Sequence, residues 1–200
     1  GPTHLPRRLV AVGDRVYATL GYGRPVSVLD AETGECLFEC ESTAGTQEIL
    51  VSDDVLIAVR KKGEPAEAAG KRYRHLNTPR ALTGVDVETG KRLWVMDGDD
   101  TADILPLSTT LSEGRVFFAT HDTVYALNAK DGSQTWSQPC SIPLKPNAYW
   151  SVTMLAAKGV LMAGGRDKLS AFACADGKPL WNGRMSYGFH SAGDVFAIGD

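Results

Sequence analysis

The sequence predicts an all-β fold built from repeated four-stranded antiparallel sheets. Short runs of alternating apolar and polar residues are separated by polar turns that contain glycine, and this pattern recurs along the chain. The 200 residues include 21 glycines and 10 prolines, which is typical of many short elements joined by tight turns. No stretch keeps apolar residues at helical spacing between capping residues, so we expect no long helix.

The second half of the repeat is a hairpin with an aromatic residue four positions after its turn glycine. The glycine–aromatic pairs of the four copies are Gly34 and Phe38, Gly90 and Trp94, Gly132 and Trp136, and Gly177 and Trp181. Successive turn glycines are 90 − 34 = 56, 132 − 90 = 42 and 177 − 132 = 45 residues apart. The repeat length is therefore in the forties, with an insertion at 61–80 in the second copy.

A first hairpin precedes each of these copies and has a two-residue polar turn between β-rich runs. The turn pairs are Gly-Asp at 13–14, Asp-Asp at 53–54, Glu-Gly at 113–114 and Lys-Gly at 158–159. Each repeat thus consists of four short antiparallel strands. Repeats of about 40–45 residues that form one such sheet are typical of β-propeller blades, and neighbouring blades must complete the core of each.

We expect one propeller segment over residues 1–200. Its blades span approximately 8–47, 48–108, 109–150 and 151–190, and 191–200 forms the first hairpin of a fifth blade. An unfinished fifth blade predicts an arc of a larger ring, of about seven or eight blades in total.

The aromatic residue of each repeat has a predicted structural role. Large flat rings pack well on glycine-bearing backbone, so one ring at a fixed place in every blade suits docking between blades. The alternative is an aromatic platform for sugar or base stacking, which would not place a ring on the last strand of every blade. We therefore assign Gly34, Phe38, Gly90, Trp94, Gly132, Trp136, Gly177 and Trp181 to docking.

Composition and charge exclude several classes of protein. Hydrophobic residues make up 43% and charged residues 22%, and the net charge is 21 − 24 = −3. This is the balance of an ordinary globular protein, not of a disordered tail, a collagen-like fibre or a general nucleic-acid binder. The apolar runs are far shorter than a membrane span of about 20 residues, and no signal peptide is visible at the N-terminus.

The cysteines predict neither a disulfide scaffold nor a zinc site. There are four, Cys36, Cys40, Cys140 and Cys174, and they are widely scattered. On one strand, Cys36 and Cys40 would lie about 13 Å apart, beyond the roughly 7 Å that a disulfide allows. Neither a CxxC nor an HxxxH pair occurs, so we expect free thiols.

Candidate binding residues fall on one rim of the propeller. In a four-stranded meander the connections from the second to the third strand and from the last strand to the next blade share a rim, and here they differ most in length. The candidates are Tyr22, Arg24, Arg60, His121, Trp150, Arg166 and His190. The three arginines could converge on an anion, or each could pair with a nearby acid. His121 and Asp122 could form a base and its orienting carboxylate, or simply a loop turn.

The insertion at 61–80 is rich in basic residues. It holds six of them against two acids, which suits a docking arm for an acidic partner. A second hypothesis is that this arm leans on the acidic loop 97–103 of the same blade. That loop also permits a calcium site, although it lacks the spacing of an EF-hand.

The repeated turn-glycine–aromatic units resemble the tryptophan-docking repeats of the quinoprotein (PQQ-like) β-propellers. The resemblance runs from about residue 7 to 200 and is closer to the non-enzymatic outer-membrane-assembly type than to the PQQ dehydrogenases. It implies a periplasmic, cell-surface or secreted location, and as partner another protein or the remaining blades of the same propeller. The dehydrogenases also carry an adjacent cysteine pair and a calcium-ligand set beside PQQ. Neither can be matched here, so we expect no cofactor, with PQQ and calcium as the alternative.

These observations favour a non-catalytic propeller that serves as a scaffold or recognition module in a longer extracytoplasmic bacterial protein. No complete nucleophile, metal or phosphate-loop motif is present in the sequence. A quinoprotein-type oxidoreductase, with its cofactor residues degenerate or outside this segment, is the first alternative. A regulatory propeller fused to a separate catalytic domain is the second. We expect no nucleic-acid partner and no catalytic residue.

Overall fold

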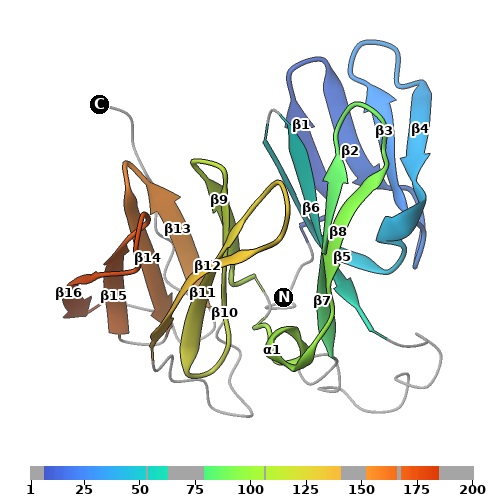
Figure 1. The fold of residues 1–200 in the computed structure, drawn as a ribbon. Coiled ribbons are helices and arrows are strands. Elements are labelled where there is room, and N and C mark those ends of the chain that lie inside the picture. Colours follow the sequence, from blue (N-terminus) through green and yellow to red (C-terminus); the bar gives the residue numbers. More distant parts are fainter. Residues whose placement is uncertain are drawn as a thin grey trace. The chain divides into compact units, whose positions relative to one another are not determined.

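The computed structural model describes residues 7–52, 54–62, 79–105, 107–140, 152–165 and 168–184. These residues form sixteen strands in four sheets, with one 3-10 turn and one short helix (Figure 1). The predicted fifth-blade hairpin at 191–200 and most of the insertion at 61–80 lie outside the described residues.

Each sheet is a four-stranded antiparallel meander in chain order. The first contains β1 (Leu9–Val12), β2 (Arg15–Thr19), β3 (Val26–Asp30) and β4 (Cys36–Cys40), followed by η1 (Glu41–Thr43). The second contains β5 (Thr46–Val51), β6 (Val55–Lys61), β7 (Arg80–Asp86) and β8 (Arg92–Met96), followed by α1 (Asp99–Ala102). The third contains β9 (Thr109–Ser112), β10 (Arg115–Ala119), β11 (Thr123–Asn128) and β12 (Gln134–Pro139). The fourth contains β13 (Thr153–Ala157), β14 (Val160–Gly165), β15 (Lys168–Ala173) and β16 (Pro179–Arg184).

This architecture confirms the predicted all-β fold of propeller blades. Every described sheet has the four short antiparallel strands that the repeat requires. The described helical segments are each a single short turn, in agreement with the missing helical periodicity. No helix in the described part of the chain has the length and apolar character needed to cross a membrane.

The hairpin turns form where their residues allow the backbone conformation that a tight turn needs. Between β9 and β10, Glu113 and Gly114 have φ of 50° and 70°, and between β13 and β14, Lys158 and Gly159 have φ of 48° and 73°. Two consecutive positive φ values match the twist of the flanking strands. These are two of the turn pairs that the sequence predicts.

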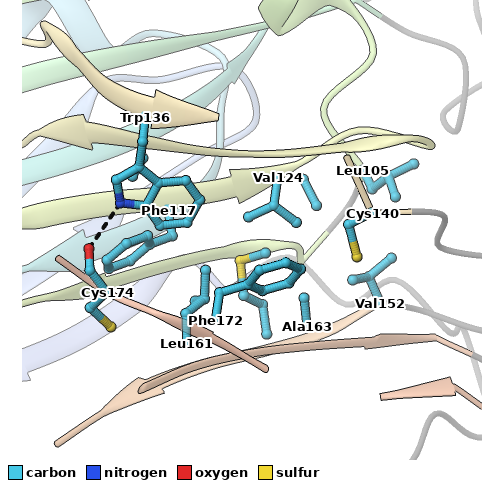
Figure 2. Packing of buried hydrophobic residues seen from close by; sticks show 13 residues of the cluster. Leu105, Phe117, Val124, Trp136, Cys140, Val152, Leu161, Ala163, Phe172 and Cys174 are labelled. Atoms are coloured by element: carbon cyan, nitrogen blue, oxygen red, sulfur yellow. Dashed lines mark hydrogen bonds between the residues drawn. The ribbon is translucent and has the colours of Figure 1, made fainter. Parts of the chain in front are cut away.

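The chain divides into two compact units, and each is described by itself. One unit holds the first two sheets together with Ala129–Gly132 of the β11–β12 turn, and the other holds the rest of the third sheet and the fourth sheet. In the first unit, Val26 and Val28 of the first sheet share a buried cluster with Leu56 and Val85 of the second. In the other unit, Phe117 of the third sheet belongs to a buried cluster with residues of the fourth sheet (Figure 2). Each sheet thus buries one face against a neighbour in its own unit.

Candidate functional site

Two of the repeat aromatics are buried and hydrogen-bonded to the backbone of a following turn. Trp94 of β8 is 9% exposed, and its indole Nε1 donates to the carbonyl oxygen of Ala129 at 2.8 Å. Trp136 of β12 is 7% exposed, and its Nε1 donates to the carbonyl oxygen of Cys174 at 2.9 Å (Figure 2). In both cases the acceptor lies three residues before the turn glycine, Gly132 or Gly177.

The aromatic rings lie directly against the turn glycines. A Cβ added at Gly132 would lie 2.6 Å from Cδ2 of Trp94, and one added at Gly177 would lie 2.6 Å from Cε3 of Trp136. Phe38 contacts Gly90 in the same way, at 2.9 Å from its Cδ2. Because real Cβ atoms do not approach ring carbons so closely, only glycine fits beneath these rings.

Each repeat aromatic also faces a residue on the neighbouring strand ten positions earlier in the chain. The antiparallel register pairs Val28 with Phe38, Gly84 with Trp94, Ala126 with Trp136, and Ala171 with Trp181. The three tryptophans therefore lie opposite Gly or Ala, whereas the smaller phenylalanine lies opposite valine. Our sequence reasoning missed this relation, although the constant spacing of ten residues is visible in the sequence.

The first and last members of the repeat differ from the others. A Cβ added at Gly34 would have no described atom within 4 Å, and Trp181 is 46% exposed. Three pairs of the predicted docking residues are thus in contact: Phe38 with Gly90, Trp94 with Gly132, and Trp136 with Gly177.

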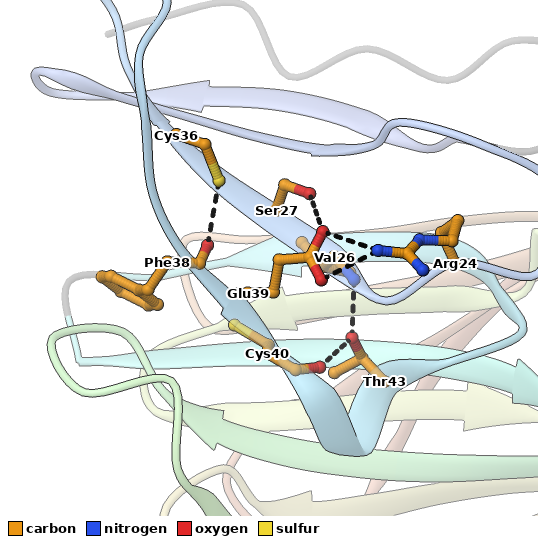
Figure 3. A network of polar contacts seen from close by, with 8 residues as sticks. All are labelled: Arg24, Val26, Ser27, Cys36, Phe38, Glu39, Cys40 and Thr43. Carbon is orange, nitrogen blue, oxygen red and sulfur yellow. Dashed lines mark hydrogen bonds and ion pairs between the residues drawn. The ribbon is translucent and has the colours of Figure 1, made fainter.

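Two of the candidate rim arginines make separate contacts. Arg24 pairs with Glu39, at 3.2 Å from Nη2 to Oε2, and Glu39 also accepts a hydrogen bond from the Ser27 hydroxyl (Figure 3). Arg60 is half-buried, and its Nε donates to Oγ1 of Thr83 at 2.7 Å. Arg24 therefore contacts the last strand of the first sheet, and Arg60 contacts a strand of the second sheet, so the two arginines have separate partners.

The remaining rim candidates are exposed or outside the described residues. Tyr22 and His121 are exposed in the β2–β3 and β10–β11 connections. Oδ1 of Asp122 accepts hydrogen bonds from the hydroxyls of Thr120 and Thr123, at 3.2 and 3.0 Å, as in a loop turn. Trp150, Arg166 and His190 lie outside the described residues.

A cluster of charged residues lies at the rim end of the second sheet. From the sequence we identified Arg60 and the basic insertion at 61–80, but not Arg7 or Glu48. Strand register pairs Thr46 with Arg60 and Lys61 with Arg80, so the start of β5, the end of β6 and the start of β7 meet there. Arg80 and Glu48 are each only 3% exposed, and Arg7 forms an ion pair with Glu48. We refer to Arg7, Glu48, Arg60, Lys61 and Arg80 as the basic rim cluster.

Burial weakens the charged state of the cations in this cluster. It lowers the pKa of Arg80 to about 10, and the charge of Glu48 partly offsets this effect. It also lowers the pKa of Arg60, which the charge of Asp97 opposes. For Lys61, burial and then the charges of Arg80 and Arg8 lower the pKa. Arg60, Lys61 and Arg80 thus lie where part of their hydration is already lost, with Lys61 and Arg80 on the face of the sheet that also carries Glu48 and Arg60 on the opposite face.

The opposite end of the second sheet carries a depression of about 450 Å³. It is lined by Asp54, Val55, Asp86, Val87, Glu88, Leu93 and Lys130. Its carboxylates already have partners, since Asp54 pairs with Lys130 at 2.8 Å and Glu88 with Arg15 at 2.7 Å. Asp86 accepts hydrogen bonds from the backbone and hydroxyl of Thr89, at 2.8 and 2.7 Å. These contacts stabilise the turns and leave little free carboxylate for a ligand.

The described residues do not fit a PQQ–calcium site. Among them, no group of three or more His, Cys, Asp or Glu side chains could hold a metal ion. All four cysteines are free, with Cys36 exposed and the other three buried, so no disulfide is present that could lie beside such a cofactor. We therefore derive no chemical step through PQQ.

The family model described as outer membrane protein assembly factor BamB matches the chain over residues 3–158 and again over 80–195. No curated protein sequence matches the chain.

Three solved structures are similar in fold. BamB from Moraxella catarrhalis is 16% identical at a TM-score of 0.51, over 87% of this chain and 47% of that protein. A europium-containing methanol dehydrogenase is 15% identical at a TM-score of 0.59, over 92% of this chain and 42% of that protein. The quinohemoprotein alcohol dehydrogenase from Comamonas testosteroni is 13% identical at a TM-score of 0.59, over 98% of this chain and 39% of that protein. The chain thus spans less than half the length of each, and at these identities the likeness concerns the fold.

Proposed function

The chain belongs to the family of the outer membrane protein assembly factor BamB, and on that basis we propose that it is a non-catalytic propeller module that recognises a protein partner. The fold neighbours include both an assembly factor and dehydrogenases, so the fold alone does not select between binding and catalysis. The described residues favour binding, because they offer a charged surface rather than a set of reactive groups.

The observation that carries this proposal is the basic rim cluster. Arg7 and the buried Arg80 interact with Glu48, and Arg60 and Lys61 are half-buried cations at the end of β6, on opposite faces of the sheet. Partner carboxylates that reach these two side chains, one on each face at the end of the sheet, would restore interactions that burial has removed. Because much of the desolvation cost is already met in the free protein, binding an acidic partner there costs less than at a fully hydrated surface. We therefore propose a partner that presents Asp or Glu side chains.

Other candidate residues have supporting roles in this proposal. The exposed Tyr22 and His121 lie in the same class of connection and could add contacts to the partner, as could Trp150, Arg166 and His190. The glycine–aromatic pairs serve to dock successive repeats. A periplasmic or cell-surface location, in a longer bacterial protein, is part of the same proposal.

Binding of an acidic probe tests the role of the rim. A fluorescent peptide of ten glutamates is titrated with the chain at low salt, and with the Arg60→Gln/Lys61→Gln variant. The matched control is Lys178→Gln/Arg184→Gln, which removes the same charge from two exposed positions in and beside β16 of the fourth sheet. We expect the rim variant to weaken binding at least about 10-fold and to flatten its salt dependence, with little change in the control. Equal weakening in both variants would refute the rim as the binding site.

The alternative is a quinoprotein-type oxidoreductase, which the two dehydrogenase neighbours bring into consideration. A spectral titration of the chain with PQQ in the presence of calcium separates the two functions. Our proposal predicts no saturable change in the PQQ spectrum. Tight, stoichiometric binding would favour the oxidoreductase instead.

A further inference from the structure

Strand β8 forms the outer edge of the second sheet, in the middle of the chain. Among the described strands it pairs with β7 alone. A strand at a sheet edge presents backbone N–H and C=O groups that can pair with another strand. The ring of Trp94 leaves this edge open, because it packs back over Gly84 of β7. The edge of β8 is therefore available to a strand from another molecule.

One face of β8 carries two exposed apolar side chains. Leu93 is 46% exposed and Val95 is 40% exposed. The register places Val95 opposite Thr83 and Arg92 opposite Val85, and Leu93 is the extra residue of a bulge between them. Thr83 and Val85 share one face of the sheet, so their partners Val95 and Arg92 share that face too. Leu93 lies two positions before Val95 and belongs to the same face.

Opposite charges flank the apolar pair on this face. Arg92 precedes the pair, Asp97 follows two positions after Val95, and both charged side chains are exposed. Burial lowers the pKa of Arg60, the charge of Asp97 raises it, and the charge of Arg92 lowers it again. Both charges thus lie near Arg60, which supports their placement on one face. Along β8 this face is basic at its start, apolar in its middle and acidic at its end.

This order of side chains is complementary to itself when two copies of β8 run antiparallel. A two-fold axis at Trp94 places Leu93 of each copy opposite Val95 of the other. The same register brings Arg92 of each copy near Asp97 of the other, at both ends of the strand pair. Apolar pairs and opposite charges on facing strands both stabilise an antiparallel sheet.

The other three outer strands do not have this property. The charged residues in and beside β4 are all acidic, so two copies would bring carboxylates together; they are Glu35, Glu39 and Glu41. Strand β12 carries no charge and ends in Pro139, as protected edges often do. In β16 the one charged residue is Arg184, and Lys178 precedes the strand, so two copies would repel each other. A second copy is therefore favoured at β8 and at none of the other three edges.

We propose that two copies of this chain associate through β8, edge to edge and antiparallel. Each β8 becomes the fifth strand of the other copy's second sheet, in an interface that uses the same surface on both sides. The contact involves the outer edge of one sheet only, so it is compatible with further blades in the same polypeptide. One strand pair covers less than the roughly 800 Å² per partner of a standard interface, so we expect a weak dimer, with a dissociation constant on the order of 10–100 µM.

Sedimentation equilibrium of the 200-residue chain tests the proposal, with two charge reversals on β8. Arg92→Asp makes both flanks of the apolar pair acidic, and Asp97→Arg makes both flanks basic. Each change brings like charges together at both ends of the strand pair. The controls Lys178→Asp and Glu32→Arg make the same changes of charge at exposed positions of the fourth and first sheets.

We expect each reversal on β8 to raise the dimer dissociation constant at least about 10-fold, and each control to change it less than about 2-fold. An equimolar mixture of Arg92→Asp and Asp97→Arg must form a dimer again, because a copy with two acidic flanks then meets a copy with two basic flanks. Two misfolded variants would not restore each other in this way. Added salt is expected to weaken the dimer of the unmodified chain and the mixed dimer alike.

Three outcomes would overturn the proposal. One is a chain that stays monomeric up to about 500 µM, well above the expected dissociation constant, as when another part of the protein covers β8. Another is a dimer that the two reversals weaken no more than their controls do. The third is a mixture that stays as monomeric as its components, which would mean that Arg92 and Asp97 do not meet between copies.

Discussion

Gly132 shows how one residue can be required for two separate physical reasons. Its φ of 72° lies in the left-handed region that other residues adopt only at a cost, and its missing side chain leaves room for the ring of Trp94. Gly13 has a similar φ of 60°, but no atom lies within 4 Å of an added Cβ. A comparison of the two glycines therefore separates the cost of backbone strain from the cost of steric contact with a ring.

Replacing each of these glycines by alanine measures the two effects. Gly13→Ala is expected to lower the free energy of unfolding by about 1–2 kcal/mol, the cost of the left-handed conformation. Gly132→Ala adds the displacement of the Trp94 ring, for a total of about 2–5 kcal/mol. Urea unfolding followed by circular dichroism gives both values. Equal losses in the two variants would mean that the ring does not depend on the glycine.

At the residue scale, the glycine–aromatic spacing could be predicted, but the partner of each indole could not. Trp94 and Ala129 are 35 residues apart, and Trp136 and Cys174 are 38 apart. A contact over such a separation depends on how two repeats meet, whereas the turn glycine and its aromatic lie in the same hairpin. The small residue opposite each tryptophan is local too, and the spacing of ten residues could have revealed it.

At the scale of an element, the rim end of the second sheet depends on one buried carboxylate. The side chain of Glu48 is 4% exposed and pairs with Arg7, and its charge also supports the buried Arg80. The Arg24–Glu39 pair of the first sheet differs in its surroundings, with side chains that are 62% and 30% exposed. A buried charge that loses its partner is costly, whereas an exposed pair contributes little.

Neutralising each glutamate tests this difference. Glu48→Gln is expected to lower the free energy of unfolding by about 3–5 kcal/mol, because it removes the negative charge beside the buried Arg80. The control Glu39→Gln is expected to cost less than about 1 kcal/mol. Thermal unfolding at neutral pH compares the two. A Glu48→Gln variant as stable as the control would show that the cluster is hydrated.

We expect the β3–β4 and β7–β8 turns to contribute less to the stability of the protein at low pH. Hydrogen bonds from the backbone and hydroxyl of Thr33 lower the pKa of Asp30, and those from the hydroxyl and backbone of Thr89 lower the pKa of Asp86. A carboxyl whose pKa is lower in the folded state stabilises the protein above its unfolded pKa. That contribution is lost as pH falls through the folded pKa.

Asp86→Asn is therefore expected to reduce the loss of stability between about pH 4 and pH 2. Urea midpoints measured across this range give the dependence, and carboxyl resonances in NMR give the two pKa values directly. Glu32→Gln is the control, since its carboxylate makes no hydrogen bond with the described residues although it lies in the Asp30 turn. An acid response that Asp86→Asn leaves unchanged would contradict the assigned role of the turn.

On the scale of the whole molecule, stability should differ between inner and outer strands. Residues 55–59 of β6 and 116–119 of β10 are fully buried and hydrogen-bonded to a strand on each side. Strand β16 is exposed throughout and pairs with β15 alone among the described strands. Local opening is easiest where few buried contacts must be broken.

Hydrogen exchange measures this gradient. After correction for intrinsic rates, amides of β6 and β10 are expected to exchange at least about 100-fold more slowly than those of β16. Mass spectrometry of peptic fragments gives the values in one experiment. Uniform exchange over all sheets would instead indicate a single cooperative opening.

The four-stranded repeat, its turns and the position of one aromatic residue in each copy could all be predicted from the sequence. These features depend on alternation along a strand and on turn residues only a few positions apart, so they are local. The tertiary structure alone decided that Arg24 pairs with Glu39 instead of joining Arg60, that Glu48 is buried with Arg7 and Arg80, and which carbonyl each indole meets. Arg7 and Glu48, for example, are 41 residues apart, and strand register and sheet packing bring them together. The local sequence pattern specifies neither the register of the strands nor the packing of the sheets.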